Sequence, residues 1–151
     1  MKSKVSFFII IFVFFTSINS FSKNLNNNIF NEIKDQLSKK GIFDTSIDLN
    51  VRISIPEQNG FSPVDLWATI IRPGGEKKLP TIVIATPYRR EMMLSRVLSF
   101  LSHDYNIISI DLRGTGSSDG SWTSFDLVEQ YDVKYLIDEW LDSEFDNLKK
   151  S

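Results

Sequence analysis

Two short apolar runs, TIVIA at 81–85 and NIISI at 106–110, constrain the fold of this chain more than any other feature. Neither run alternates with polar residues, which indicates that both faces of each strand are buried, as in a parallel sheet. Between them, Glu91–His103 has apolar residues at helical spacing, namely Leu94, Val97, Leu98 and Leu101. A strand, a helix and a second strand form a right-handed crossover unit, so the sequence predicts an α/β fold.

An antiparallel hairpin is predicted ahead of this unit. The segment Asp48–Ile55 alternates, which places four apolar residues on one face of a half-buried strand: Leu49, Val51, Ile53 and Ile55. Asn59-Gly60 is a turn signal, and it precedes a second strand, Leu66–Ile71, which ends at Arg72-Pro73-Gly74-Gly75. Together the two segments indicate an antiparallel pair.

One helix is predicted before these strands in the sequence and another after them. Ile29–Lys40 has helical spacing and stops at Gly41, after an Asn-rich stretch, Phe21–Asn31, that is typical of a linker. Ser124–Asp142 is predicted to be a long helix, with Ser124 as its N-cap and an acidic residue in its first turn. The apolar face of this helix consists of Val133, Leu136, Ile137, Trp140 and Leu141.

The first 22 residues have the pattern of an export signal. Lys2 and Lys4 precede an apolar run, Val5–Phe15, and a small-residue cleavage site follows at Ser20-Phe21-Ser22. The run is shorter than the about 20 apolar residues of a membrane span, although an uncleaved anchor is the alternative. We therefore expect cleavage of the signal peptide at 1–22 and export to the periplasm or the exterior. No stable membrane anchor is expected after cleavage.

Charge and composition exclude several kinds of partner and site. The formal net charge is −2, so no basic field recruits nucleic acid. The chain contains no Cys, which rules out disulfides and cysteine metal sites. Asp119 stands where a dinucleotide fingerprint needs its third Gly, and no Gly-Lys-Ser or Gly-Lys-Thr follows. No metal-ligand constellation is evident either, and we expect neither a metal nor a cofactor.

The stretch GSSDG, Gly116–Gly120, matches the G-x-S-x-G pattern of serine-hydrolase nucleophiles. A nucleophile elbow joins a strand directly to a helix, whereas about a dozen residues separate the two elements here. The only His, His103, precedes Ser118, whereas the nucleophile precedes its base in this fold. We therefore interpret Ser118 as a residue of a structural loop, with a minimal esterase that uses Ser118 as the alternative.

Three motifs carry a resemblance to a known family. They are the turn Thr86-Pro87-Tyr88, the segment DLRGTGSSDGSW at 111–122, and the helix with Glu129, Asp132 and Glu139-Trp140-Leu141. Together they resemble the cocaine esterase / X-prolyl dipeptidyl-peptidase family of α/β hydrolases, over Leu49–Asn147. The resemblance implies that TIVIA is strand 3 and NIISI is strand 4 of that fold. It predicts a partial α/β-hydrolase fold with strands 1–4 only, truncated, over residues 46–151, after a linker and helix at 23–45.

The resemblance assigns one catalytic residue to the chain. In that family the Tyr of the T-P-Y turn donates its hydroxyl to the oxyanion, and Tyr88 matches it. A phenol held by a Pro-fixed turn at the carboxyl end of a strand suits this role. The simpler alternative is an aromatic side chain that caps the core beside Pro87. By the family pattern, the nucleophile would follow position 151, and the triad Asp and His would lie further on.

The loop residues have structural interpretations. We expect Asp111 and Arg113 to pair and hold the loop, and Gly114 and Gly116 to adopt positive φ. Trp122 is interpreted as loop packing, with the lining of a pocket as the alternative.

The remaining marked residues are also interpreted as structural. Trp140 lies on the apolar helical face and is expected in the core. Glu129 and Asp132 share a helix face, which predicts a solvated face or a loop anchor rather than acid–base chemistry. Arg89 and Arg90 are expected to be exposed, with substrate contact as the alternative.

The leading hypothesis is an N-terminal fragment of an exported serine hydrolase that is inactive alone. The intact family would cleave small ester, amide or X-Pro peptide substrates, and a complementing C-terminal hydrolase chain is the partner to expect. The second hypothesis is a non-catalytic exported binding or scaffold protein on the same half-fold. In the resembled fold strand 3 would then remain an open apolar edge, which is an aggregation hazard.

Overall fold

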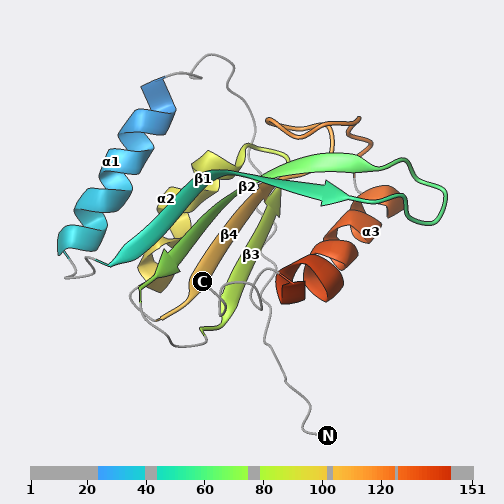
Figure 1. Ribbon diagram of the computed structural model, residues 1–151. Coiled ribbons are helices and arrows are strands. Elements are labelled where there is room, and N and C mark those ends of the chain that lie inside the picture. Colours follow the sequence, from blue (N-terminus) through green and yellow to red (C-terminus); the bar gives the residue numbers. More distant parts are fainter. Residues whose placement is uncertain (1–23, 40–43, 75–78, 102–103, 125, 144–151) are drawn as a thin grey trace, which may run out of the picture.

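The computed structural model describes residues 24–39, 44–74, 79–101, 104–124 and 126–143. Four strands form one sheet in the order β1-β2-β4-β3, with helices on both faces (Figure 1). The strands are β1 (Thr45–Ile55), β2 (Val64–Pro73), β3 (Thr81–Thr86) and β4 (Asn106–Asp111). The helices are α1 (Asn24–Lys39), α2 (Arg90–Leu101) and α3 (Leu127–Tyr135), which continues into a π-helical turn, η1 (Leu136–Trp140).

The two apolar runs form the parallel part of the sheet. β3 pairs with β4 in parallel, from Thr81 opposite Asn106 to Thr86 opposite Asp111, and every residue of both strands is buried. The chain crosses from β3 to β4 through α2. β4 pairs on its other side with β2, which is antiparallel to it. The predicted fold, a hairpin followed by parallel strands with a crossover helix, is confirmed.

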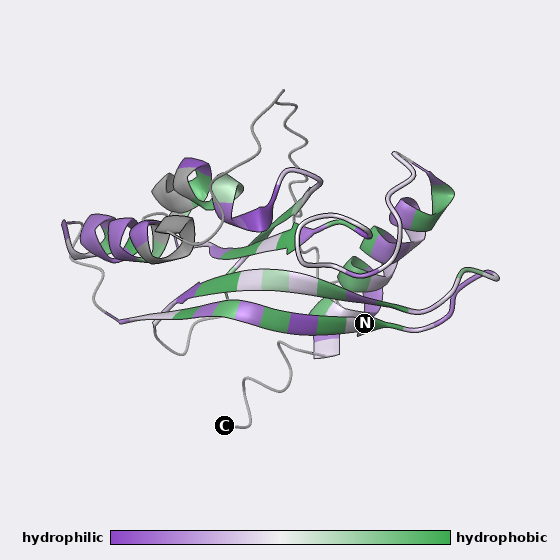
Figure 2. Cartoon of the chain, turned by 90° about the horizontal axis from the view of Figure 1, so that it is seen from above, coloured by the Kyte–Doolittle hydropathy of each residue, from purple (hydrophilic) through white to green (hydrophobic). Residues whose placement is uncertain are grey.

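The hairpin of β1 and β2 confirms the predicted antiparallel pair and its turn signal. Gln58 and Phe61 exchange backbone hydrogen bonds of 3.2 and 2.8 Å across the loop. Asn59 and Gly60 between them have φ of 50° and 81°, as both central residues of a type I′ turn require. Figure 2 shows the alternation of hydrophilic and hydrophobic residues along the hairpin strands.

The sheet separates two hydrophobic cores. Ile82 and Ile84 of β3 face α1 and α2, whereas Val83 faces the opposite core, where Leu136 and Leu141 pack. Each fully buried Ile or Leu stabilises the fold by about 1.5–3 kcal/mol relative to exposure. The first core takes from the helices Ile33, Leu37, Met93, Leu94 and Val97. The chain is therefore a three-layer arrangement built around two faces of one sheet.

A bulge in β1 changes which face its apolar residues occupy. The register with β2 shifts between Asp48 and Val51, so Leu49 and Asn50 lie in the bulge. A shift of one residue exchanges the two faces of a strand. Ile47 therefore packs against the core of α1 and α2, whereas Val51 packs against the core of α3 and η1. Val51, Ile53 and Ile55 share this second core, as predicted, and Leu49 in the bulge is half-buried.

Two helix boundaries differ from the prediction. α1 begins at Asn24, inside the stretch predicted as a linker, because burial of Ile33 and Leu37 stabilises a helix that its Asn-rich start disfavours. α3 is capped by Asp126, whose side chain accepts from the Leu127 N–H at 2.6 Å. Ser124, the predicted cap, instead has φ of 61°.

The predicted signal peptide at 1–22 lies outside the described residues. Within those residues, no helix is long and apolar enough to cross a membrane.

Candidate functional site

Two segments meet at the carboxyl ends of the parallel strands. One is the β3 turn, residues 86–90, which leads into α2, and the other is the β4 loop, residues 111–122 (Figure 1). Ligands of open α/β sheets bind at this edge, because the loops that follow the strands gather there. The candidate site is therefore built from these two segments.

Tyr88 lies in the β3 turn and its side chain is half-buried. Its N–H donates to the Thr86 side-chain oxygen at 3.1 Å, and Pro87 fixes the backbone between them. Arg89, which follows, has φ of 74°, a left-handed conformation that costs a non-glycine residue about 1–2 kcal/mol. The turn thus holds the backbone of Tyr88 at the carboxyl end of β3.

Asp111 joins the two segments through a buried carboxylate. Its Oδ1 accepts from the Arg90 N–H at 2.8 Å, and its Oδ2 accepts from the Ser117 N–H at 3.0 Å. The guanidinium of Arg90 also pairs with this carboxylate, and both side chains are almost completely buried. Two predictions are corrected here: Asp111 pairs with Arg90 rather than Arg113, and Arg90 is buried, whereas Arg89 is exposed. A crossover helix starts beside the end of β4, which brings Arg90 closer to Asp111 than the sequence suggests.

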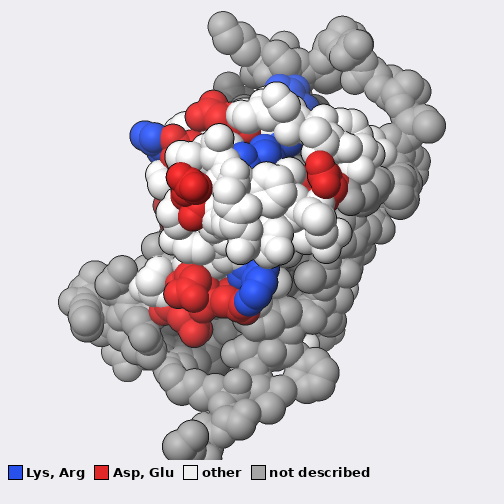
Figure 3. Space-filling view, turned by 90° about the vertical axis from the view of Figure 1, so that its right-hand side faces the viewer, with Lys and Arg blue, Asp and Glu red and all other residues white. Residues whose placement is uncertain are grey.

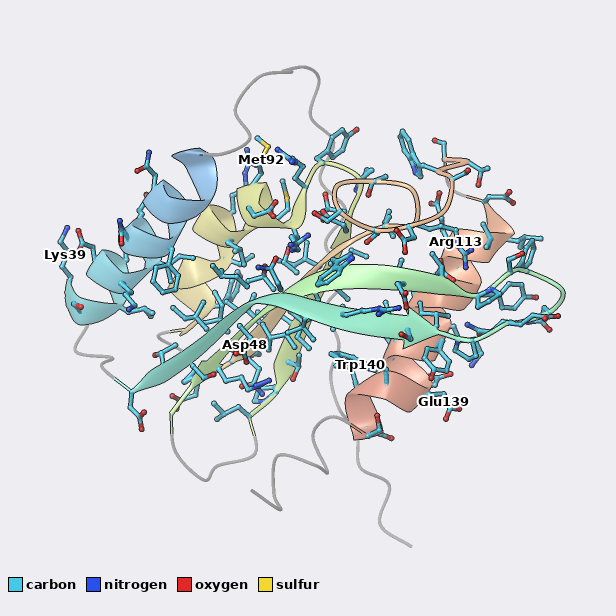
Figure 4. The ribbon with its side chains drawn as sticks, turned by 45° about the horizontal axis from the view of Figure 1, so that its top comes forward. Lys39, Asp48, Met92, Arg113, Glu139 and Trp140 are labelled. Atoms are coloured by element: carbon cyan, nitrogen blue, oxygen red, sulfur yellow. The ribbon has the colours of Figure 1, made fainter. Side chains whose placement is uncertain are left out.

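Arg113 anchors the β4 loop to α3 (Figure 4). Its Nε and Nη2 each donate to the Asp132 carboxylate at 2.8 Å, which is a bidentate pair. Its Nη1 donates to the Ser62 carbonyl at 3.0 Å, so the hairpin loop is held as well. Asp132 is a loop anchor, as predicted. The solvated helix face is wrong, because Asp132 and Glu129 are both buried.

Ser118 is engaged in backbone contacts of the loop. Its hydroxyl donates to the Asp111 carbonyl at 2.7 Å and accepts from the Trp67 N–H at 2.9 Å. The neighbouring Asp119 N–H donates to the Asp65 carbonyl at 2.9 Å, which extends the contact between the loop and β2. No helix starts directly after GSSDG, so the interpretation as a structural loop is confirmed. His103 lies outside the described residues.

The glycines of the β4 loop allow its backbone to fold onto its own contacts. Gly114 has φ of 70° and Gly116 has φ of 55°, as predicted. A Cβ at Gly116 would overlap the carboxylate of Asp111, and one at Gly114 would overlap the backbone of Ser121 and Trp122. The loop can therefore close around Asp111 only with glycine at these positions.

The two marked tryptophans have different environments. Trp122 is 43% exposed, so the predicted loop packing leaves much of its side chain in solvent. Trp140, which was expected in the core, packs against the core of α3 and η1 but is only half-buried (Figure 4). Met92 at the first turn of α2 and Leu127 at the start of α3 are also exposed.

No metal site is evident in the part of the chain that the structure describes, since no group of three or more His, Asp or Glu side chains gathers there.

The face that Figure 3 shows carries acidic and basic side chains scattered among uncharged ones. One exposed pair, Lys134 with Asp138, raises the pKa of the lysine through its hydrogen bond.

Asp65 of β2 contacts β1 through its side chain and the β4 loop through its backbone carbonyl. The guanidinium of Arg52 pairs with its carboxylate, and the Ser54 hydroxyl donates to it at 2.6 Å. The hydrogen bond from Arg52 is the main reason why the pKa of Asp65 is lowered, and that from Ser54 is the second. The same pairing raises the pKa of Arg52.

We expect the substitution Arg52→Ala to raise the pKa of Asp65 towards the ordinary aspartate value of about 3.9. A lowered pKa means that ionised Asp65 stabilises the fold above its unfolded-state pKa. That contribution is lost as the pH falls through the folded-state value, and it is smaller in Arg52→Ala, where the folded-state pKa of Asp65 lies closer to the unfolded-state one. Carboxyl titration by NMR measures the shift, with Ser54→Ala as a variant of smaller expected effect. An unchanged titration curve in Arg52→Ala would contradict the pairing.

The Arg90–Asp111 contact is the part of the site that inspection of the sequence missed. The signal was present, because Asp111 ends an apolar strand and Arg90 starts the crossover helix beside the neighbouring strand. Parallel pairing brings both positions to the same edge.

Comparisons with known proteins relate the chain to one family. A family model described as X-Pro dipeptidyl-peptidase (S15 family) matches residues 59–149, which is more than half of the chain. A solved structure that resembles the chain is an aminopeptidase from the marine sediment archaeon Thaumarchaeota archaeon, with 22% sequence identity and a TM-score of 0.46. That match covers 66% of this chain and 20% of the aminopeptidase, so the chain spans about a fifth of its length. No curated protein matches the chain. By the extent of the family match, the chain belongs to the X-Pro dipeptidyl-peptidase (S15) family.

Proposed function

We propose that this chain supplies the oxyanion-binding side of the active site of an exported serine hydrolase. The intact hydrolase would cleave small esters, amides or X-Pro peptides through an acyl-enzyme. On its own, the chain would hydrolyse none of them. The observation that carries the proposal is the place of Tyr88, at the carboxyl end of β3 in a chain of this hydrolase family.

The role of Tyr88 follows from the chemistry of acyl transfer. Attack on a carbonyl places negative charge on its oxygen, and a donor already aimed at that oxygen lowers the barrier. A phenol on a turn with Pro87 on one side and a helix start on the other has little freedom to move away. Tyr88 would therefore donate its hydroxyl to the oxyanion without reorganisation of the turn.

The proposed lack of activity in the chain alone rests on Ser118. A serine nucleophile needs a free hydroxyl and a base that accepts its proton. The hydroxyl of Ser118 already donates to a backbone carbonyl and accepts from a backbone N–H. We propose that the nucleophile and its base come from a segment outside residues 1–151, on the same polypeptide or on a second one.

Reconstitution tests the proposed role of Tyr88. The DNA that follows codon 151 is read in all frames for a G-x-S-x-G segment, and the whole open reading frame that carries it is co-expressed with the chain. Hydrolysis of an X-Pro nitroanilide is then measured. We expect Tyr88→Phe to lower kcat by about 10²–10³-fold, with KM little changed, because an oxyanion donor acts in the transition state.

The control and the contrary outcome are both specific. Tyr105→Phe is the matched control, because Tyr105 packs against Phe100 at 6.3 Å between ring centroids, on the side of α2. An unchanged kcat in Tyr88→Phe would refute the oxyanion role. If no frame encodes the segment, the non-catalytic binding or scaffold protein replaces the hydrolase fragment.

Export is a separate part of the proposal. It is supported by the charged and apolar pattern of residues 1–22 and by the small residues at its end. Sequencing of the mature N-terminus after expression in a bacterium tests it. A mature chain that starts at Phe21 or Lys23 supports export, and a retained Met1 in the membrane fraction supports the anchor instead.

A further inference from the structure

We infer that Asp111, acting through Arg90, is a positioning residue that fixes the direction of the Tyr88 hydroxyl. The inference rests on the proposed oxyanion role of Tyr88. It assigns a function to a buried ion pair that the proposed chemistry does not itself use.

Several restraints meet at the carboxylate of Asp111. Asp111 is 1% exposed and accepts from Arg90 twice, through the backbone N–H and the guanidinium, and from Ser117 once. The backbone N–H of Arg90 starts α2, so this carboxylate also caps that helix. Asp111 therefore locks the β3 turn and the β4 loop to each other.

Other elements also restrain Arg90. Its carbonyl accepts from the buried Ser109 hydroxyl at 2.9 Å. Its guanidinium donates to the Asn50 side-chain oxygen at 2.9 Å and to the Leu49 carbonyl at 3.4 Å. Both acceptors belong to the bulge of β1, which turns them towards the guanidinium. The bulge thus holds the same arginine as Asp111 does. We call Asp111, Arg90 and the two bulge acceptors the hub.

The backbone of Arg89 connects Arg90 to Tyr88. Arg89 is the single residue between Tyr88 and Arg90, and its φ of 74° is disfavoured for a side chain of this type. Such a conformation persists only where the surroundings hold both of its ends. On one end, the Tyr88 N–H is bound to Thr86, and on the other, the Arg90 N–H is bound to Asp111. Loss of Asp111 would let Arg89 relax and would rotate the Tyr88 ring away.

A matched pair of substitutions tests the inference in the full-length chain. Asp111→Asn weakens this hub, and Asp132→Asn weakens the other buried carboxylate–arginine pair of the same loop, which has the same 1% exposure. The chain contains four Tyr residues, so incorporation of 3-fluorotyrosine gives four fluorine NMR resonances, assigned by single Tyr→Phe variants. The ring of Tyr131, which lies 5.8 Å from that of Phe61, reports on the α3 side.

The expected result is a separation of the two effects. In Asp111→Asn the Tyr88 resonance moves most of the way to the position of free 3-fluorotyrosine and sharpens, while the Tyr131 resonance stays. In Asp132→Asn the Tyr131 resonance moves and the Tyr88 resonance stays. A Tyr88 resonance that keeps its position in a folded Asp111→Asn chain, or that moves equally in both variants, overturns the inference.

A milder variant covers the case in which Asp111→Asn does not fold. Ser109→Ala removes only the hydroxyl that holds the Arg90 carbonyl, and we expect it to move the Tyr88 resonance alone. An unchanged Tyr88 resonance in Ser109→Ala would then overturn the inference. None of these NMR measurements needs turnover. An inactive reconstituted hydrolase would therefore refute the proposed function, but it would not change the position of the Tyr88 resonance in any of these variants.

Discussion

The substitution Arg113→Met is expected to lower the free energy of unfolding by about 3–5 kcal/mol, as removal of one partner of a buried ion pair does. The methionine approximates the length of the lost side chain but offers no hydrogen-bond donors. The Asp132 carboxylate then stays buried without the two donors that it has at 2.8 Å. The Ser62 carbonyl also loses its donor, so the hairpin loop is released from the β4 loop. Urea unfolding followed by circular dichroism measures the change.

Two further variants separate the buried pair from charge in general. The double substitution Arg113→Met with Asp132→Leu removes both charges and should recover much of the lost stability, because no uncompensated charge remains. Lys134→Met removes one partner of the exposed pair with Asp138 and should leave stability unchanged. A loss in Arg113→Met no larger than that in Lys134→Met would contradict the assignment of Arg113 as the anchor of the loop.

The second large effect is expected for Gly114→Ala. The left-handed conformation at this position costs an alanine about 1–2 kcal/mol. The new methyl group would also overlap the backbone of Ser121 and Trp122, and backbone displacement of this kind costs about 1–3 kcal/mol more. We therefore expect a total loss of about 2–5 kcal/mol. The same unfolding experiment measures it.

Gly60→Ala is the matched control for this prediction. Gly60 also has a positive φ, 81°, but a Cβ there would meet no atom within 4 Å. Only the conformational cost of about 1–2 kcal/mol remains in that variant. Equal losses in Gly60→Ala and Gly114→Ala would show that the close approach of the β4 loop to itself does not limit position 114.

Local patterns predicted the elements of the fold well, because burial on both faces, alternation and helical spacing are visible in short windows of sequence. The bulge at Leu49 and Asn50 escaped this reasoning. A strict alternation continues through it in the sequence, and only pairing with β2 shows that the faces exchange. The bulge also contacts Arg90, which is about forty residues away in the chain.

In the candidate site, too, local features were predicted correctly and contacts between distant residues were not. Tyr88, the glycines and the structural loop around Ser118 were predicted from motifs whose members lie close together in the sequence. The ion pairs were assigned wrongly, because Asp111 and Arg113 are near neighbours in the chain but lie at the end of a strand and in the loop beyond it. Their partners, Arg90 and Asp132, come from the two helices that pack on opposite faces of the sheet. Only the order of the strands and helices in space decides these pairs.

Treatment of the full-length chain with a fluorophosphonate probe, followed by intact mass and peptide mapping, tests the central claim most directly. The claim is that Ser118 holds the β4 loop together and that the chain carries the oxyanion side of a hydrolase site without its nucleophile. We predict no adduct in a sample that circular dichroism shows to be folded. An adduct on Ser118 would make GSSDG a nucleophile segment and would contradict the account.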